Sequence, residues 1–126
     1  MIPRLGTPED APFLAAIYNE GIEDRVATFE TRPRSEADVR AWFDGRHPVV
    51  VVEDGGQIVA FASTSPYRPR GCYAGIVEVS VYVARRFRRR GAGRAALQEL
   101  IEQAVQQLRR TTELARDLMV IAHIAT

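Results

Sequence analysis

An arginine-rich segment with two glycines, residues 85–94, carries the side chains best suited to bind an anion. Gly91 and Gly93 allow a tight turn and a close approach of the backbone to a ligand. A helical pattern follows, and the first amides of a helix have no partner within it. The helix dipole and the six arginines of this segment add positive charge. The sequence therefore predicts a phosphate site here.

A strand pattern precedes this segment and a helix pattern follows it. Positions 77–83 alternate between valines and Glu78, Ser80 and Tyr82, the period of a strand with two different faces. Beyond the glycines, apolar residues recur at spacings of three and four: Leu97, Leu100, Ile101, Ala104, Val105 and Leu108. The order of strand, loop and amphipathic helix puts the predicted phosphate site at the start of the helix.

Three known phosphate loops can be compared with this segment. A nucleotide-triphosphate loop needs a lysine, and the chain contains none. The dinucleotide pattern G-x-G-x-x-A fits Gly91 to Ala96, but seven residues separate Val83 from Gly91, whereas that pattern starts almost directly after a strand. The third pattern, Arg-x-x-Gly-x-Gly, fits Arg88-Arg-Arg-Gly91-Ala-Gly93 after a Val-Tyr-Val strand end.

This third pattern resembles the acyl-coenzyme A pyrophosphate loop of the GNAT superfamily of N-acetyltransferases. Further segments resemble successive landmarks of its phosphinothricin acetyltransferase branch: Asn19–Ile22, Ala27–Thr31, Ser65–Arg68 and Val77–Val83. The resemblance covers residues 1–103. Members of the branch continue through more strands and a helix, so it implies a single domain that is incomplete at its C-terminal end, with residues 104–126 as a divergent tail.

The resemblance implies an α+β fold, a mixed and mostly antiparallel sheet flanked by helices. It also implies an enzyme that moves an acetyl group from acetyl-CoA to the primary amine of a small, amino-acid-like acceptor, without a metal. Family members usually protonate the thiolate with a tyrosine on a later helix, and no tyrosine follows Tyr82. The alternative is a non-catalytic fragment that serves as a binding or dimerisation module.

Glu78 is the candidate general base. A carboxylate on the strand face opposite the valines could accept a proton from an incoming ammonium group. The resemblance assigns this role to the glutamate three positions before Val-Tyr-Val, and Glu78 matches that position. A solvated carboxylate or a partner for one of the arginines is the alternative.

The resemblance also assigns the cofactor-binding residues. The backbone of Val81 and Val83 would pair with the pantetheine arm like an added strand, although both side chains also suit a core. Exposed charges contribute little, so we expect about two of the six arginines to touch the ligand. The full set is Val81, Tyr82, Val83, Arg88, Arg89, Arg90, Gly91, Ala92, Gly93 and Arg94.

Five residues are candidates for the acceptor pocket: Phe29, Glu30, Tyr67, Arg68 and Tyr73. Arg68 is suited to hold the carboxylate of an amino-acid-like acceptor. Phe29 and Tyr73 are equally suited to a core.

The composition of the chain limits the kinds of ligand and the cellular compartment that we expect. Seventeen basic and sixteen acidic residues give a net charge of +1, so the positive charge is local and suits a small phosphorylated ligand better than nucleic acid. Cys72 is the single cysteine, which favours a reducing cytoplasm. The N-terminus is too short and too soon broken for a signal segment, and no apolar run could span a membrane.

The first half of the chain predicts two helices. Thr7 begins a helix over residues 8–20, with Gly21 as its stop. Ser35 begins a second helix that ends at Gly45, and residues 25–34 form a loop between them.

The second half predicts mainly strands. Residues 49–53 and 57–63 form a hairpin, and the prolines of residues 65–71 predict a loop. After the glycine loop we expect helix to about Arg116 and a strand over residues 118–124. The apolar side chains of residues 111–126 predict docking on a second copy of the chain and hence a homodimer.

Overall fold

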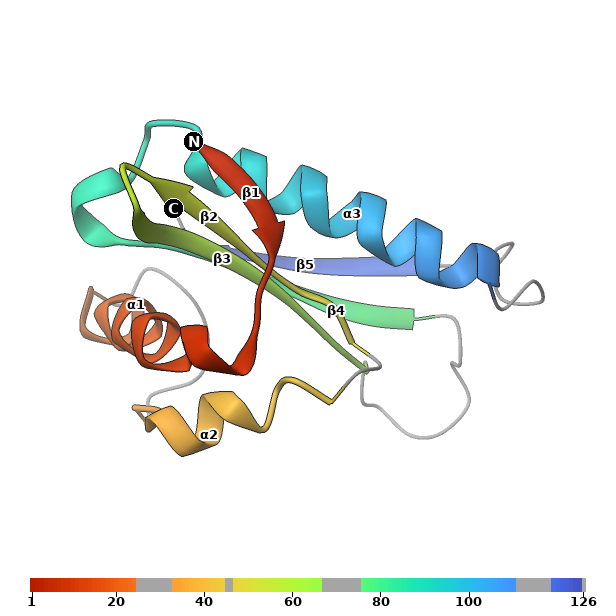
Figure 1. Cartoon of the computed structure of the whole chain (residues 1–126), viewed down its shortest axis with the longest axis horizontal. Coiled ribbons are helices and arrows are strands. Elements are labelled where there is room, and N and C mark those ends of the chain that lie inside the picture. Colours follow the sequence, from red (N-terminus) through yellow and green to blue (C-terminus); the bar gives the residue numbers. More distant parts are fainter. Residues whose placement is uncertain (25–32, 45–46, 67–75, 111–118, 126) are drawn as a thin grey trace.

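The computed structural model describes residues 1–24, 33–44, 47–66, 76–110 and 119–125. Within these ranges one sheet has the strand order β1-β2-β3-β4-β5 (Figure 1). Only β4 and β5 are parallel; the other neighbours are antiparallel. The predicted α+β fold with a mixed, mostly antiparallel sheet is confirmed. Its strands are β1 (Ile2–Leu5), β2 (Val49–Asp54), β3 (Gln57–Pro66), β4 (Ile76–Val83) and β5 (Met119–Ala125).

Helices cover both faces of the sheet (Figure 1). The 3-10 turn η1 (Pro8–Asp10) leads into α1 (Ala11–Asp24), which lies with α2 (Glu36–Arg40) on one face, and α3 (Ala92–Arg110) covers the other. The valines of β2 contribute side chains to the core on both faces of the sheet. Val49 and Val51 pack with α1 and α2, whereas Val50 and Val52 pack with α3.

The two faces of β4 differ, as the alternating pattern predicts. Val79, Val81 and Val83 are buried in the cluster beneath α3. Tyr82 is buried on the α1 face, where its ring stacks on Phe61 with 5.2 Å between centroids. The strand thus joins both cores and carries its C-terminal end to the loop before α3.

Gly21 does not end the first helix, because α1 continues to Asp24. A Cβ on Gly21 would lie only 3.0 Å from Cδ1 of Tyr82. The glycine therefore lets α1 approach β4 closely. The predicted helix start is confirmed, since the carboxylate of Asp10 accepts a hydrogen bond from the Thr7 amide at 2.8 Å.

The second helix also begins as predicted but is shorter. The Ser35 hydroxyl accepts a hydrogen bond from the Asp38 amide at 3.1 Å. The helix ends at Arg40, before the predicted stop at Gly45, which lies outside the described residues. Trp42 packs beyond its end against the α1-side core.

One strand was not predicted, and one predicted loop is partly wrong. β1 is not among the predicted strands; it has only four residues and includes Pro3, and it lies at the sheet edge, where proline is tolerated. β3 runs through Ser65 and Pro66, where the prolines predict a loop. Pro66 lies beyond the first β2 pair, Val49 with Ser63, so its missing N–H removes no bond to β2.

The C-terminal segment completes the sheet of its own chain. β5 pairs with β4 from Met119 beside Ile76 to Ala125 beside Tyr82, close to the predicted strand over residues 118–124. The described part of this segment thus pairs within its own chain, and its docking on a second copy stays a prediction. Residues 111–118, which follow the described end of α3, lie outside the described residues.

Candidate functional site

The chain turns sharply between β4 and α3. The short 3-10 turn η2 (Arg85–Phe87) follows β4, and beyond it Arg89 and Gly91 have φ values of 66° and 89°. Glycine adopts this left-handed conformation readily, whereas a side chain makes it unfavourable. The surrounding structure must therefore hold the backbone of Arg89 in this unfavourable conformation.

This turn leaves hydrogen-bond donors free at the start of α3. The amide of Ala95 donates to the carbonyl of Gly91 at 3.1 Å, which is the first helical bond. The amides of Ala92, Gly93 and Arg94 precede it and have no acceptor within the helix. A Cβ on Gly91 would meet nothing within 4 Å, so the turn faces open space. The geometry is suited to an anion.

Three of the six arginines around this turn are held by neighbouring side chains. Arg85 donates to both carboxylate oxygens of Asp24, from Nε at 2.8 Å and from Nη2 at 2.9 Å. Arg88 donates from Nη1 to the same carboxylate at 2.7 Å, and Arg86 donates to Gln57 at 2.6 Å. Hydrogen bonds from Arg85 and then Arg88 lower the pKa of Asp24 to about 2.

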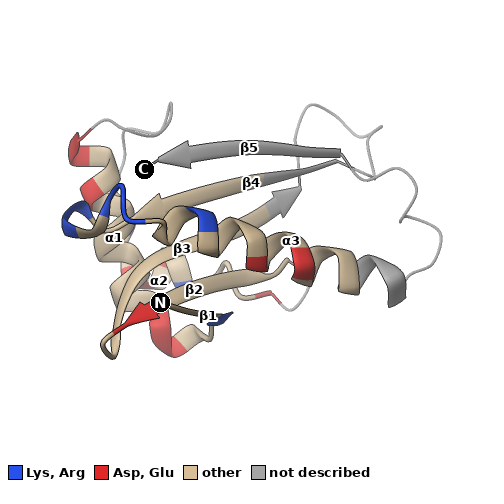
Figure 2. Ribbon diagram, turned by 90° about the horizontal axis from the view of Figure 1, so that it is seen from above, with Lys and Arg blue, Asp and Glu red and all other residues tan. Residues whose placement is uncertain are grey.

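The other three arginines are exposed. Among the described residues, the side chains of Arg89, Arg90 and Arg94 form no hydrogen bond or ion pair. The guanidinium of Arg90 lies over the ring of Phe87, 5.5 Å from its centroid. Figure 2 shows this basic segment between β4 and α3, beside the acidic end of α1. Only half of the predicted positive charge is therefore free to meet a ligand.

The outer edge of β4 is where the sequence predicts a pantetheine arm. The amide of Ala84 donates to the carbonyl of Val59 on β3 at 2.8 Å. Because backbone groups alternate in direction along a strand, Tyr82 also faces β3, whereas Val81 and Val83 face the opposite edge. β5 lies along that edge as far as Tyr82, and Arg88 Nε is 3.4 Å from the carbonyl oxygen of Val83.

Tyr82 differs from its two neighbours in the predicted cofactor set. Its backbone faces β3, and its side chain is only 3% exposed, packed between Tyr18 and Phe61. The structure thus points to a packing role for Tyr82 and leaves it almost no surface for a ligand.

Glu78 lies in the same strand, in register with Ser65 on β3 and Ile121 on β5. It is the third residue of β4, five positions before the end of the strand. The acceptor candidates Phe29, Glu30, Tyr67, Arg68 and Tyr73 lie outside the described residues. The structure therefore brings together the strand end and the basic loop, and it does not place the acceptor set.

Asp24 is not among the residues that the sequence predicts, yet it binds two arginines of the loop. A signal was present in the charges: Glu20, Glu23 and Asp24 all lie near the C-terminal end of α1. The helix dipole disfavours negative charge at that end, which indicates a cationic partner elsewhere in the fold. Arg85 and Arg88 are that partner.

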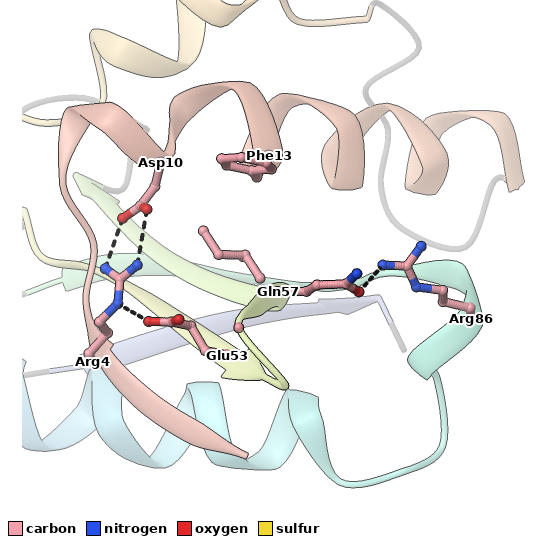
Figure 3. Close-up of a pocket in the computed structure, with 8 residues that line it drawn as sticks. Arg4, Asp10, Phe13, Glu53, Gln57 and Arg86 are labelled. Carbon is pink, nitrogen blue, oxygen red and sulfur yellow. Dashed lines mark hydrogen bonds and ion pairs between the residues drawn. The ribbon is translucent and has the colours of Figure 1, made fainter.

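A pocket of about 350 Å³ lies near the N-terminal end of α1 (Figure 3). Arg4 donates two hydrogen bonds to Asp10, at 2.9 and 3.0 Å, and another to Glu53. The charges of Arg4, Asp10 and Glu53 are thus paired with one another, and Arg86 donates to the neutral side chain of Gln57, which favours a structural role. Its lining residues are Arg4, Asp10, Phe13, Glu53, Gly56, Gln57, Ile58 and Arg86.

The described ranges give no support for metal binding or a membrane-spanning helix. No group of three or more histidine, cysteine, aspartate or glutamate side chains there could hold a metal ion. His47 pairs instead with neighbouring Asp44 at 2.7 Å. None of the helices in the same ranges has the length and apolar character needed to cross a membrane.

The family model for the acetyltransferase (GNAT) family matches residues 14–119. The match covers most of the chain, and the chain belongs to this family. The L-methionine sulfoximine/L-methionine sulfone acetyltransferase of Pseudomonas paraeruginosa is 38% identical over 103 residues, which cover 78% of this chain and 60% of that protein. The chain thus spans about 60% of the length of this curated relative.

Solved structures agree with this assignment. The ribosomal-protein-alanine N-acetyltransferase of Brucella melitensis superposes with a TM-score of 0.80 at 35% identity, covering 97% of this chain and 73% of that chain. A GNAT phosphinothricin acetyltransferase of Sinorhizobium meliloti, in complex with acetyl-CoA, gives a TM-score of 0.75 at 32% identity, covering 83% and 60%. The predicted resemblance to the GNAT superfamily and its phosphinothricin acetyltransferase branch is confirmed.

Proposed function

We propose that this protein transfers an acetyl group from acetyl-CoA to the primary amine of a small, amino-acid-like acceptor. The observation that carries the proposal is the start of α3, where three free amides and three exposed arginines surround the turn at Gly91. Family membership supports the donor. The acceptor class rests on relatives named for methionine sulfoximine and phosphinothricin.

The loop and the strand end would hold different parts of the donor. Acetyl-CoA supplies the acetyl group as a thioester when bound. The backbone amides from Arg89 to Gly93 would hold its pyrophosphate, with the exposed arginines adding charge. The edge of β4 would hold the pantetheine arm by strand-like hydrogen bonds. Val83 lies beyond the last pair of β4 and β5, Tyr82 with Ala125, so β5 does not pair with that edge there.

Glu78 would act as the general base. Its carboxylate would accept a proton from the ammonium form of the acceptor, so that the neutral amine could attack the thioester carbonyl carbon. The C–N bond would form as the C–S bond breaks, and coenzyme A would leave as a thiolate that takes up a proton from solvent. The residues Phe29, Glu30, Tyr67, Arg68 and Tyr73 would form the acceptor pocket, where Arg68 would pair with the acceptor's carboxylate.

An acetylation assay tests this proposal. Purified protein with acetyl-CoA should acetylate methionine sulfoximine or phosphinothricin faster than a simple alkylamine that lacks the carboxylate. Glu78→Gln should lower the rate near neutral pH about 100-fold and leave coenzyme A affinity unchanged. An equal loss of affinity would make Glu78 a structural residue. Thermal stabilisation by acetyl-CoA without any product would favour the non-catalytic binding module.

We further propose that the protein works in the cytoplasm as a homodimer. β5 is the last strand in the sheet order, and an edge strand offers unpaired backbone groups to a second copy. Light scattering should then report twice the 14.1 kDa chain mass. A single chain mass at micromolar concentration would contradict the dimer.

A further inference from the structure

The C-terminal end of α1 holds the loop between β4 and α3 at several points. The carboxylate of Asp24 accepts hydrogen bonds from Arg85 and from Arg88, which are 61 and 64 positions away in sequence. One turn earlier in the helix, Glu20 Oε1 accepts a hydrogen bond from the backbone amide of Arg85 at 2.9 Å. The loop is thus attached to α1 through both its backbone and its side chains.

The attached loop contains an unfavourable backbone conformation. Arg89, with a φ of 66°, follows directly after Arg88. Such a residue persists only where its surroundings over-determine it. On one side Asp24 fixes Arg85 and Arg88, and on the other side α3 begins at Ala92. The contact with Asp24 is therefore the restraint that the strained turn needs at its N-terminal side.

The ion pair is also more enclosed than an ordinary surface pair. The side chain of Arg88 is 15% exposed and that of Asp24 is 25% exposed. Fully solvated pairs contribute little to stability, but partial burial strengthens the hydrogen bond from Arg88 to Asp24. The two hydrogen bonds from Arg85 to Asp24 are more exposed.

We infer that Asp24 is a positioning residue for the coenzyme loop: it restrains Arg85 and Arg88 so that the turn at Arg89 presents the first amides of α3 to the pyrophosphate. The inference rests on the proposed function for the identity of the ligand. In this arrangement Arg88 shapes the loop, and the contacts with phosphate come from the backbone and from the exposed arginines.

Hydrogen exchange without any ligand tests the restraint. Asp24→Asn removes the charge and keeps the shape, so amides of residues 85–91 should exchange about tenfold faster. The matched control is Glu23→Gln. Glu23 lies in the same turn of α1, is 67% exposed and reaches Arg85 only at 3.7 Å. Exchange in Asp24→Asn that equals the control would overturn the inference.

Coenzyme A titration tests the consequence for binding. In Asp24→Asn the Kd of coenzyme A and the KM of acetyl-CoA should rise about fivefold, while kcat at saturating acetyl-CoA stays within about twofold. Asp24→Glu, which keeps the charge, should recover most of the affinity. Adding Arg88→Gln to Asp24→Asn should cause little further loss, because both changes break one contact.

Two results would contradict this role. Tighter binding of coenzyme A by Asp24→Asn would show that the released arginines bind the ligand themselves and that Asp24 competes with it. Full additivity with Arg88→Gln would show that the two residues act separately. If the wild-type protein binds no coenzyme A, the proposed function fails, and hydrogen exchange alone then decides whether Asp24 holds the loop.

Discussion

Two networks of arginines and carboxylates lie at the two ends of α1, and they differ in which residue type is at the centre. At the N-terminal end of α1, one arginine, Arg4, binds two carboxylates, Asp10 and Glu53. At its C-terminal end, one carboxylate, Asp24, binds two arginines, Arg85 and Arg88. Counted by the side chains that hydrogen-bond to one another, the first network has a formal charge of −1 and the second a formal charge of +1. Glu20 and Glu23, which lie 4.0 and 3.7 Å from Arg85, offset that positive charge.

The difference separates a structural network from a functional one. The Arg4 network ties β1 and β2 to the start of α1, and its cation is fully used. The Asp24 network lies beside the free amides of α3 and the arginines Arg89, Arg90 and Arg94, which form no ion pair in the described part of the chain. We therefore expect damage to the first network to change stability, and damage to the second to change coenzyme affinity.

The largest effect should come from the structural network. Asp10→Asn removes the charge that Arg4 binds and weakens the cap on Thr7, so the free energy of unfolding should fall by about 2 kcal/mol. Denaturant titration measures this change. Coenzyme A affinity at a temperature where the variant is folded should stay the same; a loss of affinity would break the separation of the two networks.

Replacing the loop glycines should weaken coenzyme A binding at least tenfold, which is about 1.4 kcal/mol. Gly91→Val with Gly93→Val adds side chains where the backbone must approach the pyrophosphate, and calorimetry measures the affinity. Gly56→Val is the matched control, because Gly56 has a φ of 80°, near the 89° of Gly91, and also has nothing within 4 Å. Unchanged affinity in a folded loop variant would refute the loop assignment.

A smaller effect should distinguish the exposed arginines from the paired ones. Arg90→Gln or Arg94→Gln should each weaken coenzyme A binding about threefold and make it less sensitive to salt, since each side chain is a solvated charge. Arg86→Gln, whose side chain already bonds to Gln57, should change affinity less. Equal losses in all three variants would mean that only net charge matters.

The smallest expected effect is on the stability of the protein at low pH. Burial raises the pKa of Asp10, but hydrogen bonds from Arg4 and Thr7 prevail and lower it overall, and Arg85 and Arg88 lower that of Asp24 to about 2. A lowered pKa in the folded state adds stability above the unfolded value and loses it as pH falls through the folded value. Melting temperature should therefore be flat above about pH 5 and fall below about pH 4. Asp24→Asn should reduce that fall; an unchanged acid limb would show that Asp24 does not contribute.

The sequence predicts the elements whose information is local. The alternation in β4, the helix starts at Thr7 and Ser35, and the glycine loop before α3 all follow from spacings within about ten residues. The family resemblance rests on the ordered set of these segments, and the sheet flanked by helices is what that resemblance implies.

What could not be predicted depends on distant partners. β1 becomes a strand only because β2 pairs with it, and Gly21 is needed only because Tyr82 packs against it. The same holds for the loop. Asp24 is 64 positions from Arg88, so the sequence shows six equivalent arginines where the described part of the structure shows three that are paired and three that are not.

The most direct test of the central claim compares two ligands that differ in the group the loop would bind. Calorimetric titration of the wild-type protein with coenzyme A and with pantetheine, which lacks the pyrophosphate, should show at least tenfold tighter binding of coenzyme A. Gly91→Val should remove most of that difference. Equal affinities for the two ligands in the wild-type protein would contradict the assignment of the turn before α3 as the pyrophosphate site.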